Sequence, residues 1–194
     1  MSQKASGYER IEGDKYFTPA WVTEALLSVE SFAGKVLDPG AGAGDIVRAL
    51  VARGLDAEGF DISPDHPSIQ QRDFFAFGVS GEIEATFYPA IVGNPAYGQQ
   101  GRLAVRFIEH ALRITKPIGG KVAMLLRVDF DSANGRRPIF GDHPAFAAKY
   151  TLTKRIRWEN LPQSASGPTE NHAWYIWSWE HAKRGGSRHY GYLP

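Results

Sequence analysis

The stretch Lys35-Val-Leu-Asp-Pro-Gly-Ala-Gly-Ala-Gly44 runs from a short apolar segment through an acidic residue into a glycine-rich turn. We predict a β-strand over Lys35–Asp38 and a helix from Asp45 to Arg53. Glycines between a strand and a helix permit a tight turn and let the backbone approach a ligand closely. The stretch therefore predicts an α/β fold with a ligand-binding loop at the end of its first strand.

The spacing of these glycines distinguishes two kinds of ligand. A dinucleotide-binding fold also has a glycine loop at this place, but its fingerprint is Gly-x-Gly-x-x-Gly. Here the glycines are Gly40, Gly42 and Gly44, and Asp45 occupies the third dinucleotide position. Asp38, which closes the strand, would repel a pyrophosphate but could pair with an ammonium group. A tight turn without a ligand is the alternative interpretation.

Apolar runs alternate with helical patterns on both sides of this turn. The further predicted strands are Ala57–Phe60, Ile69–Arg72, Ala90–Gly93 and Lys121–Leu126. One further helix is entered through Thr18, with Pro19 as its first helical residue, and another begins at Leu103. This alternation implies a parallel sheet with right-handed crossovers. Tyr150–Trp158 and Ala173–Trp179 are expected to follow as an antiparallel pair.

The stretch Ile91-Val-Gly-Asn-Pro-Ala-Tyr-Gly98 places polar and aromatic residues where the fourth strand ends. Enzymes with α/β folds carry their chemistry at the carboxyl ends of such strands. The side-chain carbonyl of Asn94 and the backbone carbonyl of Pro95 can accept the two hydrogens of a planar amino group, which increases electron density on its nitrogen. Tyr97 could stack on the ring that carries this group, as enzymes that flip a base require.

A carboxylate also follows the second strand. Asp61 lies roughly 20 residues beyond the glycine loop, where a carboxylate can accept hydrogen bonds from both hydroxyls of a ribose. The alternative is that Asp61 caps a surface helix. In register with the glycine loop, the ribose interpretation is favoured.

Several of these segments resemble S-adenosylmethionine-dependent amino methyltransferases. Asn94-Pro-Ala-Tyr97 is similar to their (Asp/Asn/Ser)-Pro-Pro-(Tyr/Phe/Trp) motif, with Ala96 in place of the second proline. The turn from Asp38 to Gly44 is similar to their Asp-Pro-x-x-Gly-x-Gly loop, and Tyr16-Phe-Thr-Pro19 resembles an element that precedes it in adenine-N6 methyltransferases. Nearly the full chain is similar to small phage and prophage DNA methyltransferase-like proteins.

The resemblance implies a Rossmann-like class I methyltransferase fold: a seven-stranded, mostly parallel sheet with a C-terminal antiparallel strand pair and helices on both faces. It implies S-adenosylmethionine as cofactor and adenine N6 in DNA as the leading acceptor. The expected cofactor-binding residues are Tyr16, Thr18, Pro19, Asp38, Gly40, Gly42, Gly44, Asp61, Ile62, Asp73, Phe74 and Asn94. The expected catalytic residues are Asn94, Pro95 and Tyr97.

Within this scheme, Asp73 and Phe74 resemble the pair that accepts from the adenine amino group of the cofactor and packs against its ring; a plain core phenylalanine is the alternative. Three other acceptors stay open: RNA adenine, cytosine N4 and protein glutamine. An alternative from another class is a cofactor- or nucleic-acid-binding module without turnover.

Charge is distributed unevenly, although the net charge is only +1. Residues 1–100 carry 7 Lys and Arg against 14 Asp and Glu, whereas residues 101–194 carry 15 against 7. This asymmetry suggests an acidic cofactor half and a basic half that faces a polyanion. The resemblance implies that this polyanion is a nucleic acid, with DNA as the leading expectation. The expected substrate-binding residues are Tyr97, Arg127, Arg136, Arg137 and Arg157. A solvated basic face without a partner is the alternative.

Composition excludes other classes of chemistry. The chain has no cysteine, so disulfide and thiolate chemistry are excluded, and its six histidines lack metal-ligand spacing, so we expect no metal. No apolar run approaches the roughly 20 residues of a membrane span, and the N-terminus lacks a signal-peptide core. We therefore expect a cytoplasmic protein without membrane association.

Residues 1–14 are expected to form a flexible N-terminus, residues 15–180 a single methyltransferase domain, and residues 181–194 a basic tail that can be disordered. A separate target-recognition domain does not fit within this length. Recognition of a DNA sequence would then fall to the loops Arg127–Pro144 and Glu159–His172 or to a specificity partner protein, unless selectivity is low.

Overall fold

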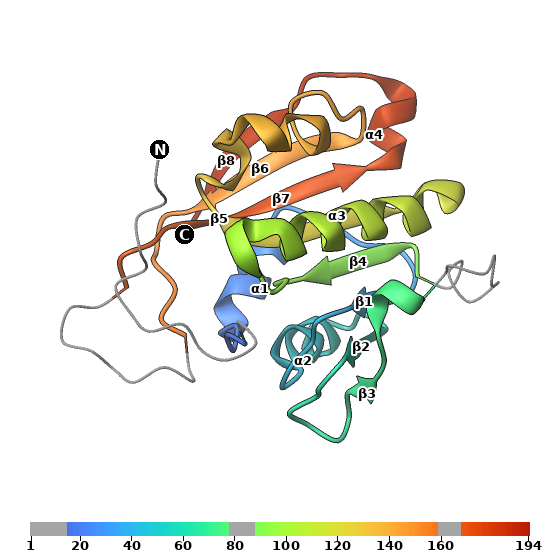
Figure 1. The fold of residues 1–194 in the computed structure, drawn as a ribbon, viewed down its shortest axis with the longest axis vertical. Helices are drawn as coiled ribbons and strands as arrows, with labels where there is room; N and C mark the ends of the chain where they lie inside the picture. The colour runs from blue at the N-terminus through green and yellow to red at the C-terminus, as the bar shows by residue number, and fades with distance from the viewer. Residues whose placement is uncertain (1–14, 78–87, 159–167) are drawn as a thin grey trace.

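Eight strands form one sheet in the order β3-β2-β1-β4-β5-β7-β6-β8 (Figure 1). The computed structural model describes residues 15–77, 88–158 and 168–194. The strands are β1 (Val36–Asp38), β2 (Ala57–Asp61), β3 (Gln70–Gln71), β4 (Ala90–Gly93), β5 (Lys121–Arg127), β6 (Phe146–Leu152), β7 (His172–Ser178) and β8 (His189–Leu193). The α-helices are α1 (Ala20–Leu27), α2 (Asp45–Ala52), α3 (Arg102–Thr115) and α4 (Trp179–Arg184). The predicted flexible N-terminus and residues 159–167 of the predicted recognition loop lie outside the described residues.

The predicted fold class is confirmed. Strands β3, β2, β1, β4 and β5 are parallel to one another, and β7 runs antiparallel to both β5 and β6. The predicted strand count was wrong by one, because β8 adds a parallel strand beside β6.

Residues 181–194, which the sequence allowed to be a disordered basic tail, contain the strand β8. Leu193 is buried in the core, and its carbonyl accepts hydrogen bonds from the Thr153 N–H at 2.8 Å and the Thr153 hydroxyl at 2.9 Å. Gly191 lies against the ring of Tyr150, where an added Cβ would be 3.1 Å from a ring carbon. The sequence pattern missed β8 because its histidine and tyrosine side chains are exposed and Leu193 alone is buried. The residues that β8 pairs with lie about 40 positions earlier in the chain.

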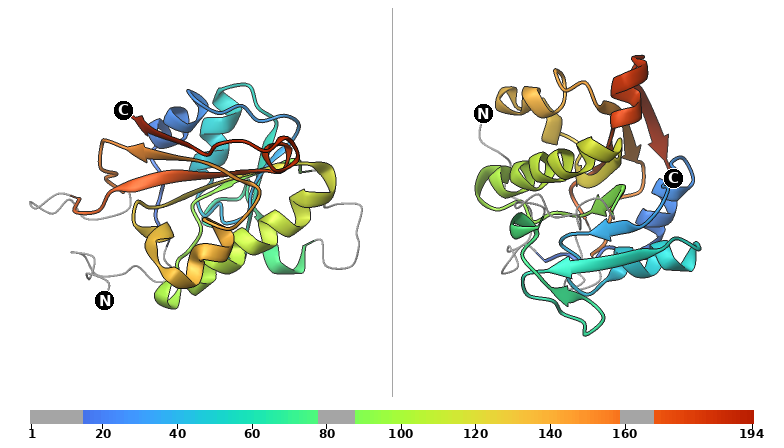
Figure 2. Two further views of the ribbon diagram at one scale, coloured as in Figure 1. Left: turned by 90° about the horizontal axis from the view of Figure 1, so that it is seen from above. Right: turned by 90° about the vertical axis from the view of Figure 1, so that its right-hand side faces the viewer.

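The two faces of the sheet are covered by different helices (Figure 2, left). Side chains of α1 and α2 pack with Ala123 and Leu125 of β5, and side chains of α3 pack with Val122, Met124 and Leu126. This alternation of successive β5 residues between two cores is the pattern of a strand buried on both faces. Helices on both faces are confirmed.

Two tryptophans of β7 tie these layers to the sheet. The indole N–H of Trp174 donates to the Val22 carbonyl of α1 at 2.9 Å, and that of Trp177 donates to the Ile139 carbonyl at 2.6 Å on the opposite face. Ile139 ends the 3-10 helix η7 (Asn134–Ile139), which follows η6 (Phe130–Ser132). The segment after β5 is therefore fixed to the sheet rather than forming an open loop.

Local boundaries differ from prediction near Pro19. This residue is the N-cap of α1 with an extended backbone conformation, rather than its first helical residue.

Within the described ranges, no helix is long and apolar enough to cross a bilayer, and no cluster of three or more acidic or histidine side chains has the arrangement of a metal site.

Candidate active site

Three polar residues stand at the carboxyl ends of adjacent parallel strands: Asp38 on β1, Asp61 on β2 and Asn94 directly after β4. They border a cavity of about 800 Å³. Of the predicted cofactor-binding residues, Tyr16, Thr18, Asp38, Gly40, Gly42, Asp61, Ile62, Asp73, Phe74 and Asn94 line this cavity. The predicted residues outside its lining are Pro19, Gly44, Pro95, Tyr97, Arg127, Arg136, Arg137 and Arg157.

Asp61 fixes the backbone of the glycine loop through two hydrogen bonds. One carboxylate oxygen accepts from the Gly42 N–H and the other from the Ser63 N–H, both at 2.8 Å. Gly42 and Gly44 have positive φ values of 50° and 83°, which favour glycine. An added Cβ on Gly44 would be 2.9 Å from a methyl carbon of Ile69, so this glycine serves the backbone of the turn at the N-cap of α2.

Asp38 lies deepest in the site and is 1% exposed. One of its carboxylate oxygens accepts from the Gly40 N–H at 3.2 Å. Burial, with a smaller contribution from the nearby charges of Asp61 and Asp45, raises the pKa of Asp38 to about 8 against the lowering effect of this hydrogen bond. A buried carboxyl with a raised pKa needs a cation to become ionised at neutral pH, and this matches a ligand that carries an ammonium group.

The raised pKa of Asp38 predicts a pH dependence of folding. Between about pH 4 and pH 8 the folded chain retains a proton that an unfolded aspartate has released. The contribution of protonated Asp38 to the free energy of unfolding is therefore complete below this pH window and is lost as pH rises through it. We expect the free energy of urea unfolding to fall more steeply between pH 5 and about pH 8 in the wild type than in Asp38→Asn. The exposed Asp56→Asn variant serves as the control, and parallel curves for the wild type and Asp38→Asn would contradict the assigned pKa.

The far wall of the cavity is aromatic. Asp73 caps the short 3-10 helix η2 (Phe74–Ala76) by accepting from the Phe75 N–H at 2.9 Å, and Phe74 stacks on Phe107 with ring centroids 5.4 Å apart. The Arg106 guanidinium lies 4.4 Å from the centroid of Phe75. This wall fits a flat heteroaromatic ring beside a carboxylate.

Sequence reasoning missed the contribution of α3 to this wall. Leu103, Arg106 and Phe107 line the cavity together with Phe75. The helical periodicity of α3 was visible in the sequence, but which residue of its apolar side borders the cavity depends on how the helix lies against the sheet.

Asn94 is oriented by Thr18. The side-chain amide nitrogen of Asn94 donates to the Thr18 hydroxyl oxygen at 3.2 Å, and Thr18 is 4% exposed. This contact directs the nitrogen toward α1 and keeps the carbonyl oxygen as the hydrogen-bond acceptor of the amide. Thr18 thus connects the Thr-Pro element to the motif after β4 across 76 residues of sequence.

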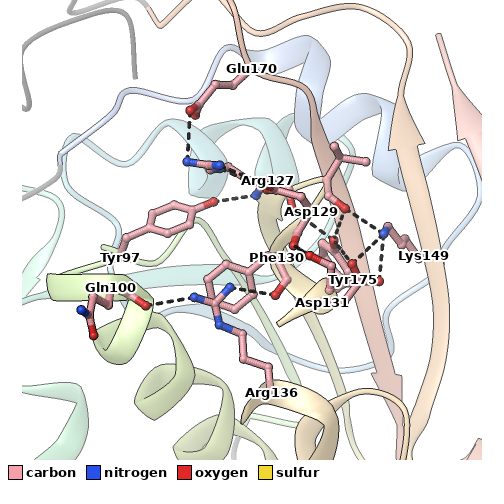
Figure 3. Close-up of polar contacts among 12 residues, drawn as sticks. Tyr97, Gln100, Arg127, Asp129, Phe130, Asp131, Arg136, Lys149, Glu170 and Tyr175 are labelled. Atoms are coloured by element: carbon pink, nitrogen blue, oxygen red, sulfur yellow. Dashed lines mark hydrogen bonds and ion pairs between the residues drawn. The ribbon is translucent and has the colours of Figure 1, made fainter. Parts of the chain in front are cut away.

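Tyr97 lies beside the segment that follows β5 (Figure 3). Its hydroxyl oxygen accepts from the Arg127 backbone N–H at 2.6 Å, and its ring meets Phe130 edge-on with centroids 5.6 Å apart. Desolvation raises the pKa of the Tyr97 hydroxyl, so it stays neutral in this position. The tyrosine is fixed at both its ring and its hydroxyl.

The four predicted substrate-binding arginines fall into two groups. Arg127 forms ion pairs with Asp129 at 3.0 Å and Glu170 at 3.1 Å, and Arg136 donates to backbone carbonyls within the same region (Figure 3). Arg137, which pairs with Asp142 at 2.9 Å, and Arg157 are exposed. The structure does not bring the four side chains together.

No family model matches the chain, and no curated protein sequence matches it. Among solved structures, one described for the conversion of a disulfide bond into a thioacetal group during echinomycin biosynthesis has a TM-score of 0.55 at 16% identity and covers 89% of this chain and 92% of that chain.

A methyltransferase from Pyrococcus furiosus has a TM-score of 0.50 at 18% identity over 82% of each chain. Magnesium protoporphyrin IX methyltransferase from Synechocystis PCC 6803, with bound S-adenosylmethionine, has a TM-score of 0.50 at 14% identity and covers 82% of this chain and 76% of that chain. At these identities the likeness concerns the fold alone. The chain therefore has the fold of class I methyltransferases.

Proposed function

We propose that this protein is an S-adenosylmethionine-dependent methyltransferase that acts on an exocyclic amino group, with adenine N6 in DNA as the leading acceptor. The observation that carries the proposal is the orientation of Asn94. Its side-chain nitrogen is held by Thr18, which leaves the side-chain carbonyl as an acceptor, and Asn94 lines the cavity that Asp38 and Asp61 also line. An acceptor oxygen at a cofactor-sized cavity is what activation of a planar amine requires.

The residues of the cavity fit the proposed cofactor part by part. Asp38 suits the methionine ammonium, Asp61 the ribose hydroxyls, and the wall of Phe74 and Phe107 with Asp73 the adenine. Ile62 is 70% exposed at the rim and offers apolar surface to the same ring. When bound, S-adenosylmethionine supplies an electrophilic methyl group on its sulfonium.

The chain's own residues orient the acceptor. The carbonyl oxygens of Asn94 and Pro95 accept the two amino hydrogens, which concentrates the nitrogen lone pair toward the cavity. Tyr97 offers an aromatic surface for stacking, and its fixed hydroxyl and edge keep that surface in place. No general base is needed, because the product cation loses its proton readily to water.

The surface beside the cavity supports a polyanionic substrate. Tyr16 lines the cavity and packs on Trp158 with ring centroids 5.3 Å apart, while Trp158 and His172 are buried behind it. Lys154 and Arg157 are exposed on the same segment after β6. An aromatic ring at the cavity, here Tyr16, with exposed cations nearby is a common means of holding flipped or single-stranded bases.

Incubation of the purified protein with methyl-labelled cofactor and with DNA, RNA or a glutamine-containing peptide tests the proposal. We expect label in N6-methyladenine after nucleoside mass spectrometry of the DNA. Label in RNA adenine, in N4-methylcytosine or in the peptide would change the acceptor and keep the reaction type. Cofactor binding without transfer to any of them would refute turnover and favour a binding module. A requirement for host extract would indicate a specificity partner.

A further inference from the structure

The loop between β4 and α3 has an unusual backbone. Gly98 and Gly101 have φ values of 61° and 76°, and Gln100 has φ 56°. Among the described residues, Gln100 is the one non-glycine residue with a positive φ. A left-handed conformation is unfavourable for a residue with a Cβ and persists where surrounding contacts impose it. The loop that carries Asn94 and Tyr97 is therefore held from outside.

Arg136 provides the contact that holds it (Figure 3). One guanidinium nitrogen donates to the Gln100 carbonyl at 2.9 Å, and another donates to the Phe130 carbonyl at 2.8 Å. The guanidinium lies 3.7 Å from the centroid of the Phe130 ring. An added Cβ on Gly101 would be 2.6 Å from this guanidinium, so the fit leaves no space between loop and arginine. We refer to these contacts of Arg136 with Gln100 and Phe130 as the Arg136 bridge.

The bridge reaches Tyr97 through Phe130, whose ring meets that tyrosine edge-on. The Tyr97 carbonyl also accepts from the Leu103 N–H at 3.1 Å, and its hydroxyl accepts from Arg127. Both ends of the turn from Tyr97 to Gln100 are thus fastened to the segment that follows β5.

That segment is itself anchored in the sheet, as Figure 3 shows. The Tyr175 hydroxyl of β7 donates to the backbone carbonyls of Arg127 and Val128 at 3.0 and 2.9 Å. Lys149 of β6 donates to the Val128 carbonyl at 2.8 Å and pairs with Asp131. The loop after β4 is consequently braced by strands β6 and β7 rather than by its own sequence.

We propose that Arg136 is a positioning residue for the proposed methyl transfer, which replaces the backbone restriction that a second proline at position 96 would supply. Arg136 holds the Asn94–Tyr97 loop so that Asn94 keeps its place at the cavity and the Tyr97 ring keeps its place against Phe130. Arg136 lies outside the lining of the cavity. The part about turnover rests on the proposed function, whereas the part about the loop does not.

The test compares Arg136→Gln with Arg188→Gln. Arg188 makes contacts of the same kind elsewhere, because it donates to the Gly141 carbonyl at 2.6 Å and lies 5.7 Å from the centroid of Phe146. We expect Arg136→Gln to lower kcat by about 10- to 100-fold with KM for the cofactor within roughly 3-fold, as for a reacting group displaced by about 1 Å. Arg188→Gln is expected to lower the melting temperature as much as Arg136→Gln does, but without lowering kcat.

Rescue gives the sharper result. Adding Ala96→Pro to Arg136→Gln should restore kcat by at least about 5-fold, while Ala96→Pro in the wild type changes kcat less than about 2-fold, a coupling between two sites in one loop. Equal losses of kcat in the Arg136 and Arg188 variants, or no rescue by proline, would overturn the proposal.

Hydrogen exchange tests whether Arg136 holds the loop, independently of turnover. The amides of residues 97–103 should exchange faster in Arg136→Gln than in Arg188→Gln, and Ala96→Pro should slow them again. Unchanged exchange would overturn the proposal even if kcat fell. If the wild type transferred no methyl group to any acceptor, the proposed function would fail, while faster exchange reversed by proline would still establish the bridge.

Discussion

Replacing Asn94 with alanine is expected to remove methyl transfer, lowering kcat by at least about 10²-fold, the scale for loss of a fixed hydrogen-bonding group at a reaction centre. The variant lacks the carbonyl oxygen that accepts from the amino group, so the nitrogen lone pair stays delocalised into the ring. Affinity for the cofactor should remain within a few-fold, because the glycine loop, Asp38 and Asp61 are untouched. Single-turnover kinetics and isothermal titration with S-adenosylhomocysteine measure the two quantities.

Two further variants sharpen this result. Asn94→Asp keeps an acceptor oxygen and should retain more transfer than Asn94→Ala. Asn134→Ala, an exposed residue of η7, should behave as the wild type. A loss of cofactor affinity as large as the loss of kcat would refute the role assigned to Asn94.

Replacing Asp61 with alanine is expected to weaken cofactor binding by about 1–3 kcal/mol, or roughly 5- to 150-fold in the dissociation constant. The carboxylate does two things at once. It accepts from the N–H groups of Gly42 and Ser63, which shapes the glycine loop, and its remaining acceptor capacity is available to the ribose. Both contributions are lost in the alanine variant.

Titration calorimetry with S-adenosylhomocysteine measures this effect, with the exposed Asp56→Ala as control. Asp61→Asn should give an intermediate affinity, since its amide keeps one acceptor but turns an NH₂ group toward one of the two backbone donors. An unchanged dissociation constant in Asp61→Ala would be incompatible with the assigned site.

The order of residues along the chain was sufficient to predict the architecture and several of the residues that line the cavity. Strands that alternate with helices form a parallel sheet, and the carboxyl ends of its strands share one edge. Asp38, Asp61 and Asn94 follow three such strands, so their convergence on one cavity could be read from the sequence. The confirmed fold class rests on the same logic.

Two predictions used charge as a guide to position, and the structure adds contacts that charge alone did not indicate. Arg136 was expected on the substrate surface from its place in a basic segment, but its guanidinium instead bridges two backbone carbonyls. The strand β8 was hidden by the basic residues around it. Whether a charged side chain binds groups within the protein depends on the carbonyls and rings that surround it. These groups come from distant parts of the chain.

The sequence by itself determined the fold class, the glycine loop and the strand-end positions of Asp38, Asp61 and Asn94, because these depend on local periodicity and on one general rule of sheet topology. Only the tertiary structure decided that Thr18 orients Asn94, that α3 supplies the aromatic wall and that the segment after β5 braces the Asn94–Tyr97 loop. Each of these depends on contacts between side chains and backbone groups that packing brings together over tens of residues. Local pattern does not encode such distances, and the conformation of the loop around Ala96 is therefore set by Arg136 rather than by its own residues.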